Sequence, residues 1–265
     1  MKNLIEEIHS SKPSDGEVFF WWIGQHGFVI KTISSLICID PFLSDHPERL
    51  ISSPLRPEDF KEFNLIACTH DHIDHLDRKS LSVIFSLNRE AILVVPNTTK
   101  KNKIDVEEKR IVFLDDGQHR RIKNLKITAI KALHEFFDKD PELGYPYLSY
   151  IIEVDKVTIL HMGDACIWEG LISSLNRWKF DLIFLPINGR DAVRWKANCM
   201  GNMTYQEAVD LAGCLKAKLT IPAHYGMFKF NTVDPLLFKD YLNAKYPDLE
   251  CRICEVGKKE ILKIK

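Results

Sequence analysis

Short apolar runs rich in β-branched residues recur along the chain, and each has the length of a strand. Turn residues separate the runs, and the early ones follow one another too closely for helices to fit between them. The predicted strands are residues 18–22, 28–32, 36–39, 65–68, 92–95, 110–114, 125–129, 150–154, 157–162, 181–185, 219–221, 251–254 and 260–264.

Helical spacing of apolar residues marks a smaller number of segments. Thr204 and Glu207 form a capping box just before one such apolar face. Asp234, which a proline follows, supplies the N-cap of a second helix. Two more helices are expected to begin after Asp77 and after Cys166.

The order of these elements favours an α/β fold. Hairpins come first, and strands that alternate with helices follow, which suits two packed mixed β-sheets covered by helices on their outer faces. A doubly wound parallel sheet fits less well, because the opening hairpins leave no room for crossover helices. The sequence has no glycine-rich phosphate loop. No linker or repeat interrupts it, so we expect one domain over residues 1–265.

The charge balance disfavours one class of function. The 265 residues include 36 Lys and Arg against 37 Asp and Glu, and this net charge of −1 provides no field for holding a polyanion. A hydrophobic fraction of 45% predicts a large core. The start of the chain lacks an apolar signal segment, and no apolar run approaches the roughly 18 residues of a membrane span. Seven cysteines, several inside apolar runs, fit a reducing compartment. We therefore expect a cytoplasmic protein that binds neither nucleic acid nor membrane.

Candidate chemistry is concentrated directly after the predicted strand 65–68. His70, His72, Asp74 and His75 follow within a few residues, where a strand turns into a helix. Such a turn directs several side chains toward one point, and imidazole with carboxylate suits zinc, manganese or iron. The alternative is a solvated polar loop, which a single histidine would favour but this dense cluster does not. The cluster predicts a metal site.

Three further candidate ligands lie far along the sequence. His134, Asp164 and His224 each stand at the end of an apolar run, where the edge of a sheet would present them. Their wide separation places each on a different structural element. We expect a folded pocket that draws these residues to the first cluster.

These motifs, taken in order, resemble the metallo-β-lactamase superfamily. The resemblance rests on H-x-H-x-D-H at residues 70–75, a later His, a Gly-Asp at a strand end and a final His after Pro. Further strings resemble the branch that contains L-ascorbate-6-phosphate lactonase. They are Trp-Trp-Ile-Gly-Gln at 21–25, Ile-Asp-Pro-Phe at 39–42, the residues at 69–77, Gly-Asn-Met at 201–203 and Ile-Pro-Ala-His-Tyr-Gly at 221–226. The resemblance implies a four-layer αββα sandwich of two mixed sheets.

The resemblance also implies a ligand assignment and a mechanism. Two divalent metal ions, zinc or manganese with iron as a further candidate, would be held by His70, His72 and His134 and by Asp74, His75 and His224, with Asp164 bridging them. A hydroxide between the metals would be the nucleophile. One metal would polarise the scissile carbonyl or phosphoryl oxygen. Asp74, Asp164 and Tyr225 are the candidate catalytic residues.

Residues beside the ligands have two interpretations each. Asp40 could accept a hydrogen bond from the outer nitrogen of a ligand histidine, or it could open an Asp-Pro turn. Thr69 could fix the loop through its hydroxyl or simply end the strand. Tyr225, next to His224, could stabilise an oxyanion or leaving group, although packing is the more common role for such a residue.

A long, polar connection between residues 186 and 203 is a candidate substrate loop. We predict that Arg190, Arg194 or Lys196, with Asn188, binds an anionic group such as phosphate, because a guanidinium suits that geometry. The alternative is a solvated loop whose basic residues form salt bridges with neighbouring acids.

The sequence therefore predicts a binuclear metallohydrolase that opens a lactone or related ester of a small, anionic, sugar-like metabolite. The runners-up are a phosphodiesterase or ribonuclease of the same fold and a thioester hydrolase. The charge disfavours the ribonuclease, since RNA binding needs a basic surface. A metal-binding scaffold without activity is the non-enzymatic alternative. The partner is expected to be a small molecule, and a homo-oligomer fits the sequence as well as a monomer.

Overall fold

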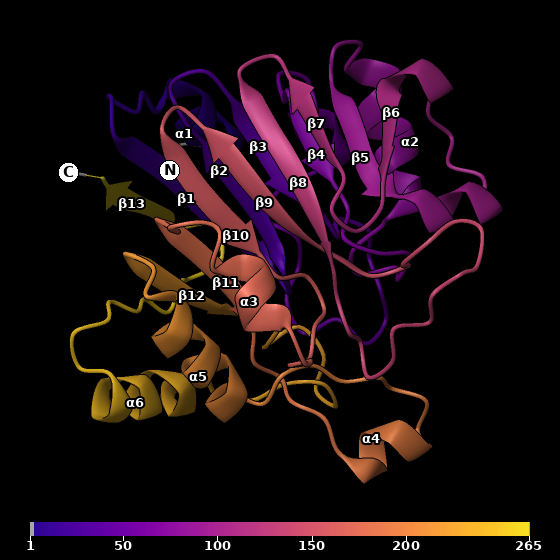
Figure 1. The fold of residues 1–265 in the computed structure, drawn as a ribbon. Helices are drawn as coiled ribbons and strands as arrows, with labels where there is room; N and C mark the ends of the chain where they lie inside the picture. Colours follow the sequence, from indigo (N-terminus) through magenta and orange to yellow (C-terminus); the bar gives the residue numbers. More distant parts are fainter. Residues whose placement is uncertain (1–2, 265) are drawn as a thin grey trace.

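Two β-sheets stacked face to face form the centre of the molecule, which the computed structural model describes from residue 3 to residue 264 (Figure 1). The first sheet contains, in spatial order, β13 (Lys259–Lys263), β1 (Glu17–Gly24), β2 (Gly27–Lys31), β3 (Leu36–Ile39), β4 (Leu65–Ala67), β5 (Ile92–Pro96) and β6 (Ile111–Leu114). The second contains β12 (Leu219–Ala223), β11 (Leu182–Pro186), β10 (Val157–His161), β9 (Leu148–Val154), β8 (Leu125–Lys131) and β7 (His119–Ile122).

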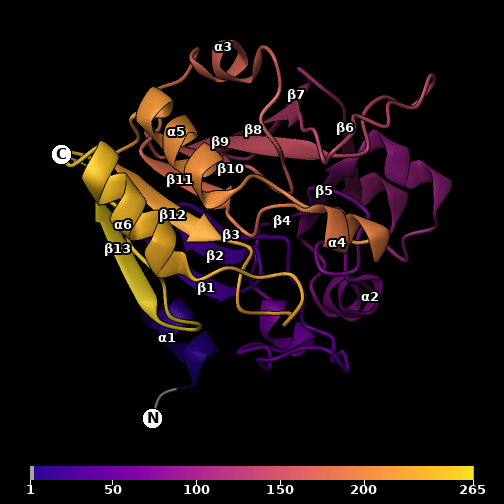
Figure 2. The same ribbon diagram turned by 90° about the horizontal axis from the view of Figure 1, so that it is seen from below.

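Helices cover the outer face of each sheet. They are α1 (Leu4–Ser10), α2 (Arg78–Leu87), α3 (Leu171–Leu175), α5 (Tyr205–Leu215) and α6 (Pro235–Lys245). Helix α4 (Ala192–Lys196) projects instead from one end of the sandwich (Figure 1), and short 3₁₀ turns lie at Pro57–Phe60, Asn97–Lys101 and Glu108–Arg110. Figure 2 shows α1 and α2 on the side of the first sheet and α3, α5 and α6 on the side of the second. The predicted α/β fold of two mixed sheets flanked by helices is confirmed.

Strand β1 shows why the first sheet lies in the middle of the stack. Successive side chains of a strand point to opposite faces. Phe20 and Trp22 belong to the core between the two sheets, whereas Phe19 and Trp21 belong to a second core beneath the helices. All four are buried. A strand that is apolar on both faces must be covered on both, which is what this arrangement provides.

The predicted helix starts have the expected capping contacts. The Thr204 hydroxyl accepts from the Glu207 backbone N–H at 3.3 Å, and the Glu207 carboxylate accepts from the Thr204 N–H at 2.9 Å. Asp77 caps α2 through the Ser80 N–H, and Asp234 caps α6. Each cap satisfies backbone donors that a helix start would otherwise leave unpaired.

Two strand assignments differ from the sequence prediction. The prediction of a strand at residues 251–254 is wrong, because this segment makes only an isolated bridge between Cys251 and Thr220. Strand β7 was not predicted, because its sequence His-Arg-Arg-Ile has one buried residue and three exposed polar ones. β7 lies at the edge of its sheet, where charged side chains can remain in water.

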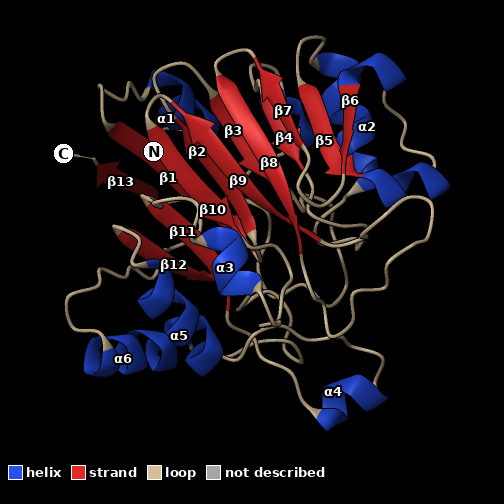
Figure 3. Cartoon of the chain, viewed as in Figure 1, coloured by secondary structure: helices blue, strands red, loops and turns tan. Residues whose placement is uncertain are grey.

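Loops gather at one end of the two sheets, where Figure 3 shows them in tan with α4 projecting beyond them. The part of the chain between residues 3 and 264 has no helix with the length and apolar character needed to span a bilayer.

Candidate metal centre

The strand directions bring the predicted ligands to one edge of the sandwich. Strand β9 is antiparallel to both β8 and β10, and β10, β11 and β12 are parallel, so β8, β10 and β12 all run the same way. The loops after these three strands therefore start at the same edge, and the turn between β4 and α2 meets them from the first sheet. The ligands carried by these loops are His70, His72, Asp74, His75, His134, Asp164 and His224.

The ligand atoms form two groups, within each of which all atoms lie within 4.8 Å of one another. The first group consists of His70, His72, His134 and Asp164, and the second of Asp74, His75 and His224. In the first group, His70 Nε2 lies 3.0 Å from His72 Nδ1. In the second, His75 Nε2 lies 3.5 Å from Asp74 Oδ2. Both groups have the imidazole and carboxylate donors that divalent transition metals prefer.

Asp164 lies between the two groups. Its Oδ1 is 3.2 Å from His75 Nε2 and 3.1 Å from His224 Nε2, both in the second group. Its Oδ2 is 3.7 Å from His134 Nε2 in the first group. Oδ1 and His75 Nε2 are buried and make no hydrogen bond with acceptable geometry within the described chain. Such buried polar atoms need a partner, and a cation between them would supply it.

The surroundings of His70, His134 and Asp164 favour the protonation states that bind a metal. At His75 burial lowers the pKa, but the carboxylates of Asp164, Asp74 and Asp40 outweigh it and raise the pKa well above its usual value. Burial lowers the pKa of His70 well below its usual value, and His75 and His72 lower it further. Burial also lowers the pKa of His134 to about 4, despite the opposing charge of Asp164. Although burial opposes ionisation of Asp164, His224 and His75 hold the pKa of its carboxyl well below the usual value. His70 and His134 are therefore neutral and Asp164 is ionised near neutral pH.

Asp40 and Thr69 lie directly behind the ligands. Asp40 Oδ2 lies 2.7 Å from His75 Nδ1, the ring nitrogen that faces away from the cluster, and accepts from the Thr69 hydroxyl at 2.7 Å. Asp40 Oδ1 accepts from the Thr69 backbone N–H at 2.7 Å, and the Thr69 hydroxyl lies 3.0 Å from His70 Nδ1. Both residues therefore make the contacts with the ligand loop that the sequence suggested, and together they fix the direction of the His75 ring.

Gln25 and Tyr147 also contact the ligands, although neither was predicted as a site residue. Gln25 Nε2 donates to Asp74 Oδ2 at 2.7 Å and lies 3.2 Å from His224 Nε2. The Tyr147 ring centroid is 5.4 Å from that of His70 and 5.0 Å from that of His134. The only sign of Gln25 was its place in the string at 21–25. Tyr147 belongs to no motif, so only the fold reveals its contact.

Tyr225 and the charged loop residues lie outside the cleft beside the ligands. Tyr225 is 6% exposed and packs against Trp22 with ring centroids 4.8 Å apart. Arg190 binds Glu207 through two contacts of 2.6 and 2.7 Å, and Arg194 Nε binds Asp191 at 2.6 Å. These pairs neutralise both guanidinium groups within the chain.

The two other predicted substrate residues are also absent from the walls of that cleft. The Asn188 amide donates to Asn231 at 2.7 Å and accepts from Asn202 at 3.0 Å, in buried surroundings. Lys196 is exposed at the end of α4. The structure therefore does not bring this set of residues together around the metal ligands.

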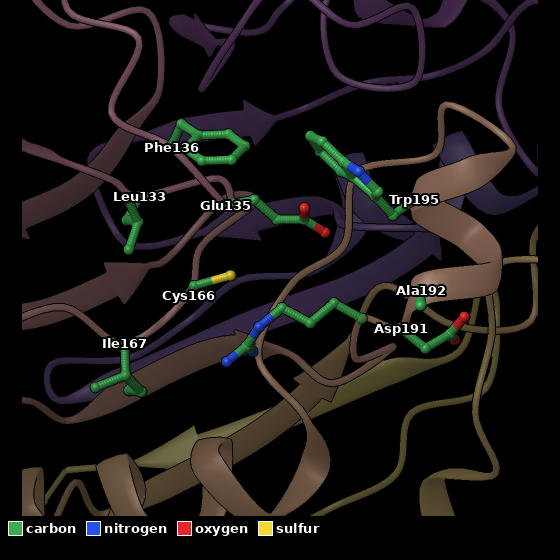
Figure 4. Close-up of a pocket in the computed structure, with 9 residues that line it drawn as sticks. Leu133, Glu135, Phe136, Cys166, Ile167, Asp191, Ala192 and Trp195 are labelled. Atoms are coloured by element: carbon green, nitrogen blue, oxygen red, sulfur yellow. The ribbon is translucent and has the colours of Figure 1, made fainter.

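The cleft has a volume of about 580 Å³, which suits a small molecule. Its walls consist of His46, Glu48, Asp71, His72, Ile73, Asp74, His134, Asp164, Trp195, Ala197, Asn198, Cys199, Met200, Phe228, Phe230 and Asn231. A second cavity of about 430 Å³ shares Trp195 with the cleft. Figure 4 shows Trp195 and Phe136 along its upper side, with the Glu135 carboxylate below them. Arg190 lines this second cavity and not the cleft.

The family model of the beta-lactamase superfamily domain matches residues 36–225, a span that contains every candidate ligand. The chain therefore belongs to this superfamily, as its motifs predicted, and it is a metal-dependent hydrolase of the metallo-β-lactamase fold. A UPF0173 metal-dependent hydrolase from Pyrococcus horikoshii is 30% identical over 84% of this chain and 92% of the relative. Another, from Archaeoglobus fulgidus, is 28% identical over 89% of this chain and 95% of the relative.

A solved structure shows the same fold. Igni18, a metallo hydrolase from Ignicoccus hospitalis, has a TM-score of 0.73 and 21% sequence identity, with 94% of this chain and 100% of that chain covered. The narrower resemblance to the branch of L-ascorbate-6-phosphate lactonase is not tested by these similarities and stays a prediction.

Proposed function

We propose that this protein hydrolyses the lactone or ester bond of a small molecule with the help of two divalent metal ions, zinc or manganese. The position of Asp164 carries the proposal, because each of its carboxylate oxygens faces a different group of ligands. The first group would hold one ion and the second group the other. Asp164 Oδ1 and His75 Nε2, which are buried and make no hydrogen bond within the described residues, support this fit.

Bound metal ions of this kind supply a hydroxide near neutral pH and polarise the oxygen of a scissile carbonyl. The chain orients the site for that chemistry. Asp40 fixes His75 from behind, and Gln25 fixes Asp74 from the side. His70, His75, His134, Asp164 and His224 are buried, so their donor atoms keep their positions without rearrangement, whereas His72 and Asp74 are partly open to the cleft. Tyr225 has no part in this proposal, because it does not line the cleft and burial raises the pKa of its hydroxyl.

The walls of the cleft favour a carbonyl substrate over RNA or another polyanion. Lys and Arg are absent from the residues that line it, whereas Glu48 and Asp71 line it together with the ligand aspartates. A chain of phosphates would meet these acids without a basic partner. For the same reason we do not extend the proposal to an anionic sugar, whose predicted partners Arg190 and Arg194 are paired with Glu207 and Asp191.

A panel of lactones, phosphodiesters and thioesters tests the proposal on protein reconstituted separately with zinc and with manganese. We expect turnover of lactones or simple esters, loss of turnover on chelation, and recovery when metal is restored. Asp240→Ala, on the exposed surface of α6, is the matched control for changes to the ligand aspartates. Turnover of phosphodiesters or thioesters alone would overturn the proposed substrate class, and full activity after complete chelation would overturn the role of metal.

A further inference from the structure

Three large apolar side chains lie half exposed at the mouth of the cleft. Ile73 is 57% exposed, Trp195 50% and Phe230 52%, and all three line the cleft. They come from separate segments: the ligand turn after β4, helix α4 and the loop after His224. One exposed apolar residue is ordinary on a protein surface. Three that line the same cavity as metal ligands mark a surface that binds apolar groups.

Other aromatic rings support two members of this apolar wall, which we define as Ile73, Trp195 and Phe230. Trp195 packs against Phe136 with ring centroids 5.6 Å apart, and Figure 4 shows the two rings side by side. Phe230 packs against Phe228, with ring centroids 5.8 Å apart, and Phe228 is buried. Both exposed rings are therefore positioned before a ligand arrives, which reduces the entropy lost on binding.

The charges around the apolar wall disfavour an anionic group at this place. The cleft has no lysine or arginine among its lining residues, and its acids are Glu48, Asp71, Asp74 and Asp164. Arg78 already pairs with Asp71, and the last two belong to the metal ligands. Glu48 forms no ion pair within the described chain, so an anion beside it would meet an uncompensated negative charge.

We propose that the substrate has an uncharged alkyl or aryl group next to its scissile bond and that the apolar wall of Ile73, Trp195 and Phe230 binds this group. The proposal rests on the proposed function, since it places this group beside a carbonyl held at the ligand cluster. The wall is a specificity determinant: it selects among lactones and esters by the size of their apolar part.

A series of γ-lactones with side chains from methyl to hexyl tests the selection. We expect kcat/KM of the wild-type protein to rise about two- to fourfold for each methylene added, because full burial of a methylene contributes about fourfold and the wall leaves one side open. Trp195→Ala and Phe230→Ala should flatten this rise, with a far greater loss for the hexyl lactone than for the methyl lactone. Leu236→Ala, which removes a 54% exposed side chain on α6, should retain the wild-type rise.

Calorimetric binding of acetohydroxamate and octanohydroxamate to the metal-loaded protein provides a second measurement that needs no turnover. Both probes have the same metal-binding head, and only the alkyl chain differs. We expect octanohydroxamate to bind at least tenfold more tightly, and Trp195→Ala to remove most of that difference. Equal binding of the two probes by the wild-type protein would overturn the role of the wall.

Together the two measurements can contradict the proposed function and the role of the apolar wall independently of each other. A chain-length preference in hydroxamate binding without hydrolysis of any lactone or simple ester would contradict the proposed function and leave the apolar wall supported. Lactone hydrolysis with no dependence on chain length, or a dependence that Trp195→Ala and Phe230→Ala leave intact, would overturn the wall and leave the hydrolase proposal in place.

Discussion

The ligand cluster and the apolar wall share one cleft but are built in opposite ways. His70, His75, His134 and His224 are at most 1% exposed, and contacts with Thr69 and Asp40 hold the rings of His70 and His75 from behind. The members of the wall are about half exposed, and Trp195 lies on a helix of only five residues that projects from the sandwich (Figure 3). The protein core therefore holds the ligand cluster in place, whereas the residues of the apolar wall project from segments at the surface of the core.

This difference separates the residues that would carry out the reaction from those that would select the substrate. A buried ligand has several partners, so its replacement disturbs the core and the metal site together. A half-exposed wall residue can change size with little effect on the fold, because water already occupies one side of it. We therefore expect substitutions in the cluster to remove activity, and substitutions in the wall to change which substrates are accepted.

The largest effect is expected for Asp164→Ala. The change removes a carboxylate that faces both ligand groups, so turnover should fall roughly a thousandfold or more, in line with the several kcal/mol that a metal contributes. Metal content, measured by atomic emission, should fall with it, while circular dichroism stays that of a folded protein. Wild-type metal content and turnover in this variant would remove the basis for treating the cluster as the reactive region.

A smaller loss is expected for Asp40→Asn, which keeps the size of the side chain and removes its charge. Asp40 receives three contacts of 2.7 Å from His75 and Thr69, and residues in this position typically change metal affinity by about 10- to 100-fold. Titration with a competing chelator measures this affinity. A metal affinity equal to that of the wild type would show that the ligand cluster keeps its position without this carboxylate.

Acid should weaken the contribution of the buried His134 to the stability of the metal-free protein. The pKa of His134 is lowered by burial to about 4 in the folded chain, whereas an unfolded histidine has a pKa near 6.5. Between these values the unfolded state binds more protons, so the free energy of unfolding should fall as the pH drops from about 6.5 to 4. A difference of this size corresponds to about 3 kcal/mol for His134.

Denaturant unfolding of the chelated protein at several pH values measures this effect. His134→Gln should lose part of the pH dependence, whereas a substitution in the half-exposed wall, such as Phe230→Ala, should retain it. The same slope in His134→Gln and wild type would contradict the assignment to His134.

The smallest effect is expected for Arg190→Ala. The ion pair of Arg190 with Glu207 joins the start of the α4 segment to α5, and both side chains are about one third exposed. A pair of this kind contributes about 1 kcal/mol or less, so the melting temperature should fall by about 2–4 °C. Metal content should not change, but the preference for long lactones should weaken because Trp195 is held less firmly. Lys245→Ala, which breaks an exposed pair with Asp210, is the control.

Much of the fold could be predicted from the sequence, because its strands are buried and its helix starts are capped. The apolar runs that became β1 to β5 were found within a residue or two of their ends. Thr204, Asp77 and Asp234 were found because a helix start needs side-chain acceptors nearby in the sequence. The edge strand β7 has no such pattern, because solvent imposes no alternation on its exposed polar side chains.

The ligands could be predicted for a similar reason, and the substrate residues could not. Metal ligands are restricted to a few residue types at strand ends, so His70 to His75 stand out in the sequence. The use of an arginine depends on its neighbours in space. Glu207 lies 17 residues after Arg190 and forms an ion pair with it. No sequence motif indicates this pair. Likewise, Ile73 and Phe230 are unremarkable apolar residues until the fold brings them to one cleft.

The carboxylate of Asp164 has one further consequence. Since its two oxygens face different ligand groups, the negative charge of this one carboxylate acts on both groups. Occupation of one group changes both the charge and the position of the oxygen offered to the other. If each group holds a metal ion, as proposed, loading of the two groups is thermodynamically linked, and linkage is reciprocal: each ion alters the affinity for the other by the same factor. A titration with metal should therefore depart from the curve of two independent sites.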